Sequence, residues 1–253
     1  MHTMILQFTA LCIALLELRG AQAEEESGPF TLLPLPYAYD ALEPYIDEET
    51  MRIHHTVHHK KYIDGLNNVL HGKFKNLGDA HSLTEYQRVA SVKGEAARNN
   101  GGGHYNHQFF FLNIAPEATR GEPDKYVSAG INIIWGSMEE MQVEFKRAAL
   151  SRFGSGWVWL GINNHGQVCI TTTANQDNPL MEGLHYHHTH MWPFLGCDLW
   201  EHAYYLKHRA NRSAYIDNFW KVVNWNQVNR NYLTAKRKKP VPPVEHEGEH
   251  EEL

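Results

Sequence analysis

The sequence predicts an α+β protein with an N-terminal antiparallel helical-hairpin domain and a C-terminal α/β domain that contains a small three-stranded antiparallel sheet. Helical spacing of apolar residues dominates the first half of the chain, and three short strand-like runs follow in the second half. Between the halves, the Pro116 to Pro123 segment has the composition of a linker. A chain of 253 residues with 42% hydrophobic content can bury a core in one or two domains.

Three helical segments are expected in the first domain, residues 24–118. Asp47 is a suitable N-cap, so the first helix should begin there and run to about Gly72. A second helix is expected from Thr84 to Arg98, because the run Asn99 to Gly103 should stop it. A third candidate, rich in aromatic residues, starts at His104. Short connections favour antiparallel packing of these helices.

The second domain, residues 119–235, is expected to mix helices and strands. Helical spacing covers Met138 to Arg152, and a last helical region covers His202 to Trp225 with a break near Asn211. The strand-like runs are Trp157 to Ile162, Val168 to Thr173 and Met191 to Leu195. Residues 236–253 form a basic, then acidic, histidine-containing tail.

Both ends of the chain carry sequences that resemble targeting signals. Residues 1–23 resemble a secretory signal peptide, because Met4 to Leu18 is mostly apolar and Ala21-Gln22-Ala23 has the small-residue pattern of a cleavage site. A mitochondrial presequence is less favoured, since the segment holds one Arg and one Glu. The final His250-Glu251-Glu252-Leu253 resembles a degenerate endoplasmic-reticulum retrieval signal. We therefore expect the secretory pathway, either outside the cell or in the reticulum lumen.

The composition indicates which classes of binding partner the protein is expected to have. The formal charge of -6 disfavours nucleic acid, and the Lys236 to Lys239 run is expected to be a solvated helix end. After signal removal no stretch is long and apolar enough to span a bilayer. Cys169 and Cys197 are too few for a disulfide framework and are expected to be buried core residues. The histidines, 18 in all, occur in groups, which points to metal binding.

The octet from Asp198 to Tyr205 is the most informative of these groups. It sets Asp198 and His202 four positions apart among an indole, a second carboxylate and two phenols. Burying a lone carboxylate is costly unless the acid and the histidine share a cation. The octet therefore predicts a metal site.

Candidate ligands in the first half are ambiguous from spacing alone. His54, His58 and Tyr62 recur every four residues and lie on one helical face, while His55 and His59 form a competing stripe. Polar aromatic residues at this spacing are more often packing residues than ligands.

The octet resembles the metal-binding signature of the iron/manganese superoxide dismutases, and the resemblance extends from about Phe30 to about Leu233. It implies one metal ion per chain, bound when the two domains dock, with the ligands His54, His107, Asp198 and His202. His104 is a near rival of His107, but the family's motif places the ligand at the later histidine.

The resemblance also implies a reaction, the disproportionation of superoxide to dioxygen and hydrogen peroxide by a mononuclear Mn(III)/Mn(II) centre. His58, Tyr62 and Gln176 are then expected to relay protons, while Trp157 and Trp200 wall off water. Lys60, Lys61 and Arg212 are candidates for guiding the anion.

The residues at two positions favour manganese over iron. Manganese members of the family carry a second-domain Gln, here Gln176, and a Gly at the first-domain position where many iron members carry Gln, here Gly103. Mixed nitrogen and oxygen ligands suit either metal, so iron remains an alternative.

The family also predicts self-association to a dimer or tetramer. Glu201 and Tyr205 stand where the family bridges subunits, Glu201 to the neighbour's His202 and Tyr205 to the neighbour's His58. Their alternative roles are an ordinary helix-start acid and an amphipathic phenol.

Two rival interpretations remain at this stage. A non-haem iron oxygenase would use two histidines and one carboxylate, but a fourth protein ligand argues against its open positions. A non-enzymatic, histidine-rich metal-carrying relative would keep the fold without turnover. The histidines between His185 and His190, and His246 with His250, could bind an accessory ion, although exposed histidines without a carboxylate partner bind metals weakly.

Overall fold

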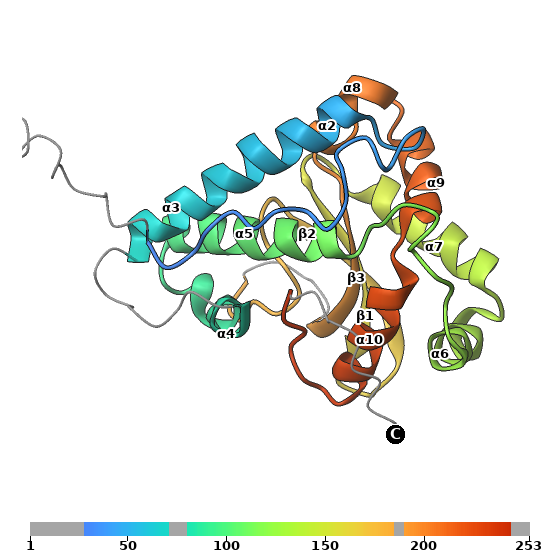
Figure 1. Ribbon diagram of the computed structural model, residues 1–253. Coiled ribbons are helices and arrows are strands. Elements are labelled where there is room, and N and C mark those ends of the chain that lie inside the picture. The colour runs from blue at the N-terminus through green and yellow to red at the C-terminus, as the bar shows by residue number, and fades with distance from the viewer. Residues whose placement is uncertain (1–27, 71–79, 185–189, 244–253) are drawn as a thin grey trace, which may run out of the picture.

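The computed structural model describes residues 28–70, 80–184 and 190–243. It confirms the predicted fold class, since a helical hairpin leads into a domain with a three-stranded antiparallel sheet (Figure 1). The signal-like residues 1–23, the accessory histidines 185–189 and the tail from residue 244 lie outside the described residues. Among the described helices, none combines the length and apolar character that a bilayer crossing requires.

The first helical rod contains three consecutive segments, α2 (Glu48–Ile53), η1 (His54–His59) and α3 (Lys60–Leu70). Asp47 is its N-cap as predicted, because its carboxylate accepts the Thr50 amide at 2.8 Å. No pattern in the sequence predicts that η1 is a π-helix, a wider turn that often occurs at functional sites. The rod packs along α5, the other arm of the hairpin (Figure 1).

The predicted second helix, Thr84 to Arg98, is wrong in its bounds. The structure has α4 (Ala80–Ala90) and a separate α5 (Glu95–Leu112), with the break at Gly94, whose φ of 107° is left-handed. The Asn99 to Gly103 run does not stop a helix but lies inside α5. Tertiary packing overrides local propensity here, because the glycines let neighbouring groups approach the helix backbone closely.

The sheet forms the base of the second domain, and all three predicted strands are present. Its order is β2-β1-β3, in which β1 (Gly156–Asn163) pairs antiparallel with both β2 (Val168–Ala174) and β3 (Met191–Asp198). β3 runs three residues beyond the predicted Leu195, so Asp198 ends the strand opposite Trp157. Cys197 is buried on β3, whereas Cys169 on β2 is partly exposed, and both thiols are free.

The helices around the sheet differ in part from expectation. The α7 helix (Met138–Ser151) agrees with the predicted segment, and Asn211 caps α9 (Arg212–Val222) at the predicted break. The short η2 (Glu201–Ala203) and α8 (Tyr205–His208) precede that break. Two helices were not predicted, α6 (Lys125–Trp135), capped by Asp124, and α10 (Trp225–Lys236), capped by Asn224.

Candidate metal centre

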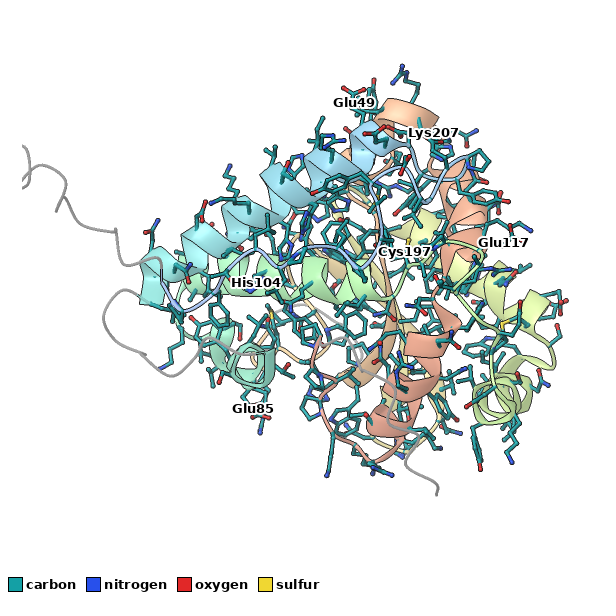
Figure 2. All side chains as sticks on the ribbon, in the orientation of Figure 1. Glu49, Glu85, His104, Glu117, Cys197 and Lys207 are labelled. Atoms are coloured by element: carbon teal, nitrogen blue, oxygen red, sulfur yellow. The ribbon has the colours of Figure 1, made fainter. Side chains whose placement is uncertain are left out.

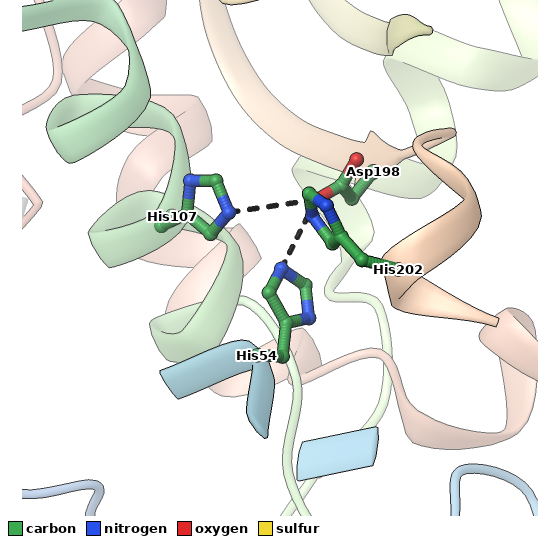
Figure 3. Close-up of side chains that lie close together, drawn as sticks. All are labelled: His54, His107, Asp198 and His202. Atoms are coloured by element: carbon green, nitrogen blue, oxygen red, sulfur yellow. Dashed lines mark hydrogen bonds and ion pairs between the residues drawn. The ribbon is translucent and has the colours of Figure 1, made fainter. Parts of the chain in front are cut away.

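Four side chains from both domains converge at one buried point (Figure 3). His54 comes from η1, His107 from α5, Asp198 from the end of β3 and His202 from η2. One nitrogen or oxygen atom of each lies within 4.8 Å of those of the others. The structure thus assembles the predicted ligand set, with two members from each domain.

The distances within this set leave room for a cation. His54 Nε2 and His202 Nε2 lie 3.1 Å from Asp198 Oδ2, and His107 Nε2 lies 3.8 Å from it. Yet His54 Nε2 and His107 Nε2 have no hydrogen-bond partner among the described residues, although both are buried. Buried polar atoms without partners are costly, and a metal ion shared by the four groups would satisfy them.

The protonation states of the histidines suit metal binding. Burial lowers the pKa of His54 to about 4 and that of His107 well below its usual value, so both imidazoles are neutral at pH 7. The Nδ1 of His107 lies 2.7 Å from the Gly103 carbonyl and therefore carries the proton donated to it. This bond fixes the tautomer and leaves the lone pair of Nε2 directed at the centre.

Asp198 supplies the negative charge. Its side chain is fully buried, which opposes ionisation, but the neighbouring His202 and His54 outweigh burial and hold its pKa well below the usual range. Its second oxygen, Oδ1, accepts the Trp200 amide at 2.9 Å. Three imidazoles and one carboxylate form a mixed nitrogen and oxygen donor set that suits manganese or iron.

A pocket leads from the surface to the least buried ligand, His202. Its lining includes the expected His58, Tyr62, Gln176 and Trp200. The His58 ring stacks on His202 with centroids 4.2 Å apart, and Trp200 stacks on the same ring at 5.5 Å. Gln176 Nε2 donates to the Tyr62 hydroxyl at 3.3 Å and so links the two domains beside the centre.

Trp157 has a different position from Trp200. It is buried on β1 and meets the His107 ring edge-on at 5.5 Å, and it does not line the described pocket. Trp157 therefore closes the centre from the core side, whereas Trp200 forms part of the wall that a small molecule would meet.

The structure also shows what the histidines on the competing helical face, His55 and His59, contact. His55 bonds the Tyr39 hydroxyl and the Leu33 carbonyl, both at 2.9 Å, so it fastens the entering chain to the rod. His59 pairs with His104 at 2.9 Å between the two arms of the hairpin. Figure 2 labels His104 on α5. This buried pair places His104 outside the ligand set, and sequence reasoning missed the pair because it compared stripes on one helix only.

The three candidate guiding cations are not equivalent. Lys61 lines the pocket. Lys60 pairs instead with Asp64 at 2.7 Å, one turn along the helix. Arg212 donates to the Arg152 and Gly154 carbonyls. Lys61 is thus the cation that the geometry places nearest to an entering anion.

Comparisons with known proteins agree with this geometry. Residues 29–115 match the alpha-hairpin domain of iron/manganese superoxide dismutases, and residues 123–231 match their C-terminal domain. The chain is 45% identical over 209 residues to a superoxide dismutase (Mn) of Acinetobacter baylyi, covering 83% of this chain and 90% of the relative. It is 42% identical over 221 residues to superoxide dismutase (Mn) 1 of Leptolyngbya boryana, covering 87% of each.

The chain belongs to the iron/manganese superoxide dismutase family. Within this family fold, packing explains why residue 103 is a glycine. A Cβ atom at this position would lie 2.3 Å from the Tyr62 ring, so a larger side chain would displace Tyr62. The space beside the centre is filled instead by Gln176 from the second domain. Phe111 packs against the His54 ring, with ring centroids 5.0 Å apart.

Proposed function

We propose that this protein is a manganese-dependent superoxide dismutase, with His54, His107, Asp198 and His202 as the ligands of one ion per chain. The observation that carries this proposal is the convergence of two partnerless imidazole nitrogens, a third imidazole and a buried carboxylate on one point. When bound, manganese would supply the electron exchange, by alternating between its trivalent and divalent states while superoxide becomes dioxygen or hydrogen peroxide. Iron loading is the alternative that the same donors allow.

The residues around the centre would control access and protons. Lys61 would attract the anion to the mouth of the pocket, against the net charge of -6. Tyr62 and Gln176 share a hydrogen bond, so they can deliver a proton to the reduced product from the hydroxyl of Tyr62. His58, on the pocket wall, would connect this pair to solvent. Trp157 and Trp200 would exclude bulk water on two sides.

Elemental analysis and a superoxide-consumption assay on the same purified sample test the proposal. About one manganese per chain with rapid dismutation is the expected result. Iron in its place, with equal turnover, would assign the iron-loaded alternative. Several zinc or copper ions per chain without dismutation would contradict the proposal and favour the metal-carrying relative.

We also propose that the protein self-associates through the face that carries Glu201 and Tyr205. Both side chains are exposed although they adjoin the ligand His202, and Tyr205 is 49% exposed. Phe153, at 98% exposure, adds a large apolar side chain held between the Arg152 and Gly154 carbonyls that Arg212 binds. Sedimentation analysis should give a dimer or tetramer, and Phe153→Asp should shift it toward monomer. A monomeric wild type would contradict this proposal.

For localisation we propose the secretory pathway, with residues 1–23 removed. The sequence Asn211-Arg212-Ser213 is an N-glycosylation sequon and offers a direct test. Asn211 is exposed and caps α9 through its Oδ1, which accepts the Ala214 amide at 3.1 Å. A glycan on its Nδ2 would leave that bond intact. We expect the native protein to start near Glu24 and to lose mass on glycosidase treatment, and Ser213→Ala to abolish the mass difference. A native protein that retains residues 1–23 would contradict the proposal.

A further inference from the structure

The turn that presents Gln176 is held by both domains: Thr173 and Trp200 of its own domain donate to the Asp177 and Asn175 carbonyls, and further bonds come from the opposite domain. This Gln176 turn, residues 175–178, follows β2 in the second domain, yet its polar contacts reach α4 and α5 of the first. We propose that Asp177 and Asn178 are positioning residues, which act with Arg98, Asn106 and Gln87 to set where the Gln176 amide stands beside the metal centre. This inference rests on the proposed function.

The first contact is a two-pronged ion pair. Arg98 on α5 donates from Nε to Asp177 Oδ1 and from Nη2 to Asp177 Oδ2, both at 2.6 Å. The Asp177 side chain is only 3% exposed, so water screens the pair weakly. Two parallel bonds fix the plane of the carboxylate as well as its distance. The residue directly after Gln176 is therefore fastened to the other domain in both position and orientation.

The second contact is a chain of buried amides. Asn178 Nδ2 donates to Gln87 Oε1 at 2.9 Å and to Asn106 Oδ1 at 3.1 Å, and Asn178 Oδ1 accepts the Leu180 amide at 3.1 Å. All three amide side chains are fully buried. Breaking one bond would leave an unpaired polar group without water, so the chain of bonds resists distortion.

The amide chain also returns to the turn backbone. Asn106 Nδ2 donates to the Gln176 carbonyl at 3.0 Å and to the Asp177 carbonyl at 3.3 Å. The backbone approaches α5 so closely that a Cβ at Gly102 would lie 2.2 Å from the Gln176 carbonyl oxygen. The main chain of Gln176 is thus held against the same helix that carries the ligand His107. The reach of its side chain to Tyr62 then follows from this docking and not from β2 alone.

A second ion pair between the same two domains provides a comparison. Arg88 on α4 pairs with Glu182 at 3.0 Å, but both side chains are more than half exposed. This pair also joins the two domains, and it lies six residues from Gln176 in the sequence. If Asp177 and Asn178 served only to hold the domains together, breaking either ion pair would change the stability of the protein and nothing else. The two pairs would then differ only in how much stability each contributes.

The test uses isosteric variants of the manganese-loaded protein, Asp177→Asn and Glu182→Gln, with Gln176→Ala as the reference. We would measure metal content, thermal midpoint and the reduction potential of the bound ion. Asp177→Asn should keep about one ion per chain and shift the potential in the same direction as Gln176→Ala, and by no more. Glu182→Gln should leave the potential unchanged. The double variant Asp177→Asn/Gln176→Ala should have the potential of Gln176→Ala.

Other outcomes would overturn the inference. A lower thermal midpoint with an unchanged potential in Asp177→Asn would show a purely structural role, and additive potential shifts in the double variant would show an effect that bypasses Gln176. If Asp177→Asn fails to fold, Arg98→Lys keeps the charge but loses the two-pronged geometry, and the same comparison applies to it. A wild type without manganese or dismutation would contradict the proposed function itself, whereas an active wild type with an unresponsive Asp177→Asn would contradict only this inference.

Discussion

At the scale of single residues, Asp198 supplies the charge that distinguishes the metal centre from a cluster of neutral imidazoles. Asp198→Asn keeps the shape and removes the charge, so we expect manganese affinity to fall by more than the roughly 10- to 100-fold typical of residues outside the ligand set. Metal analysis after dialysis against a chelator measures this loss. Asp217→Asn, an exposed acid paired with Lys146, is the control and should retain the metal. Equal retention in both variants would remove Asp198 from the ligand set.

Tyr62 illustrates a residue that serves the reaction without holding the ion. In Tyr62→Phe the ring still packs against His107 and Gly103, so metal content should not change, but the bond to Gln176 and the donated proton are lost. Turnover should fall by about 100-fold, the lower end of general acid effects. Rapid-mixing kinetics over a range of superoxide concentrations measure this. Unchanged turnover throughout that range would exclude the role of Tyr62.

At the scale of elements, α5 shows that packing against one neighbour can reverse a general rule. Gly to Ala inside a helix usually stabilises by about 0.5–1 kcal/mol. In Gly103→Ala the new Cβ would lie 2.3 Å from the Tyr62 ring, so we expect the free energy of unfolding to fall by about 1–3 kcal/mol instead. Denaturant unfolding measures the sign. Ala96→Gly on the exposed side of α5 is the control for helix propensity alone and should be destabilising.

The α5 helix also illustrates which features of the structure could be predicted from the sequence and which could not. Asp198 and His202 were predictable because a buried acid and an imidazole one turn apart need a shared cation, and the strands because their composition is locally consistent. The course of the chain through Asn99 to Gly103 was not predictable, since local propensity predicts a stop. The reason for glycine at 101, 102 and 103 is the close approach of Tyr86, Gln176 and Tyr62, which are distant in sequence. The π-helical turn at η1 likewise has no local signature in the sequence.

At the scale of the whole molecule, the many buried histidines make stability depend on pH. Burial lowers the pKa of His104 to about 3 and that of His54 to about 4, and His59 is lowered as well, whereas an unfolded chain titrates these groups near 6.5. Between these values the unfolded state binds more protons than the folded state, so stability falls on acidification below about pH 6.5. Each such histidine contributes about 1.4 kcal/mol per pH unit.

This dependence can be assigned to a group outside the metal centre. His104 is not one of the four ligands; it bonds His59 and packs edge-on against Phe30. His104→Gln retains a polar side chain but no longer takes up a proton, so the metal-free variant should lose less unfolding free energy between pH 6.5 and 4.5, by about 1.4 kcal/mol for each pH unit. Denaturant unfolding at several pH values, with exposed His165→Gln as the control, measures both slopes. Equal slopes in wild type and His104→Gln would mean that His104 is not held neutral in the folded protein, and the acid sensitivity would then belong to the other buried histidines, such as His59 and His54.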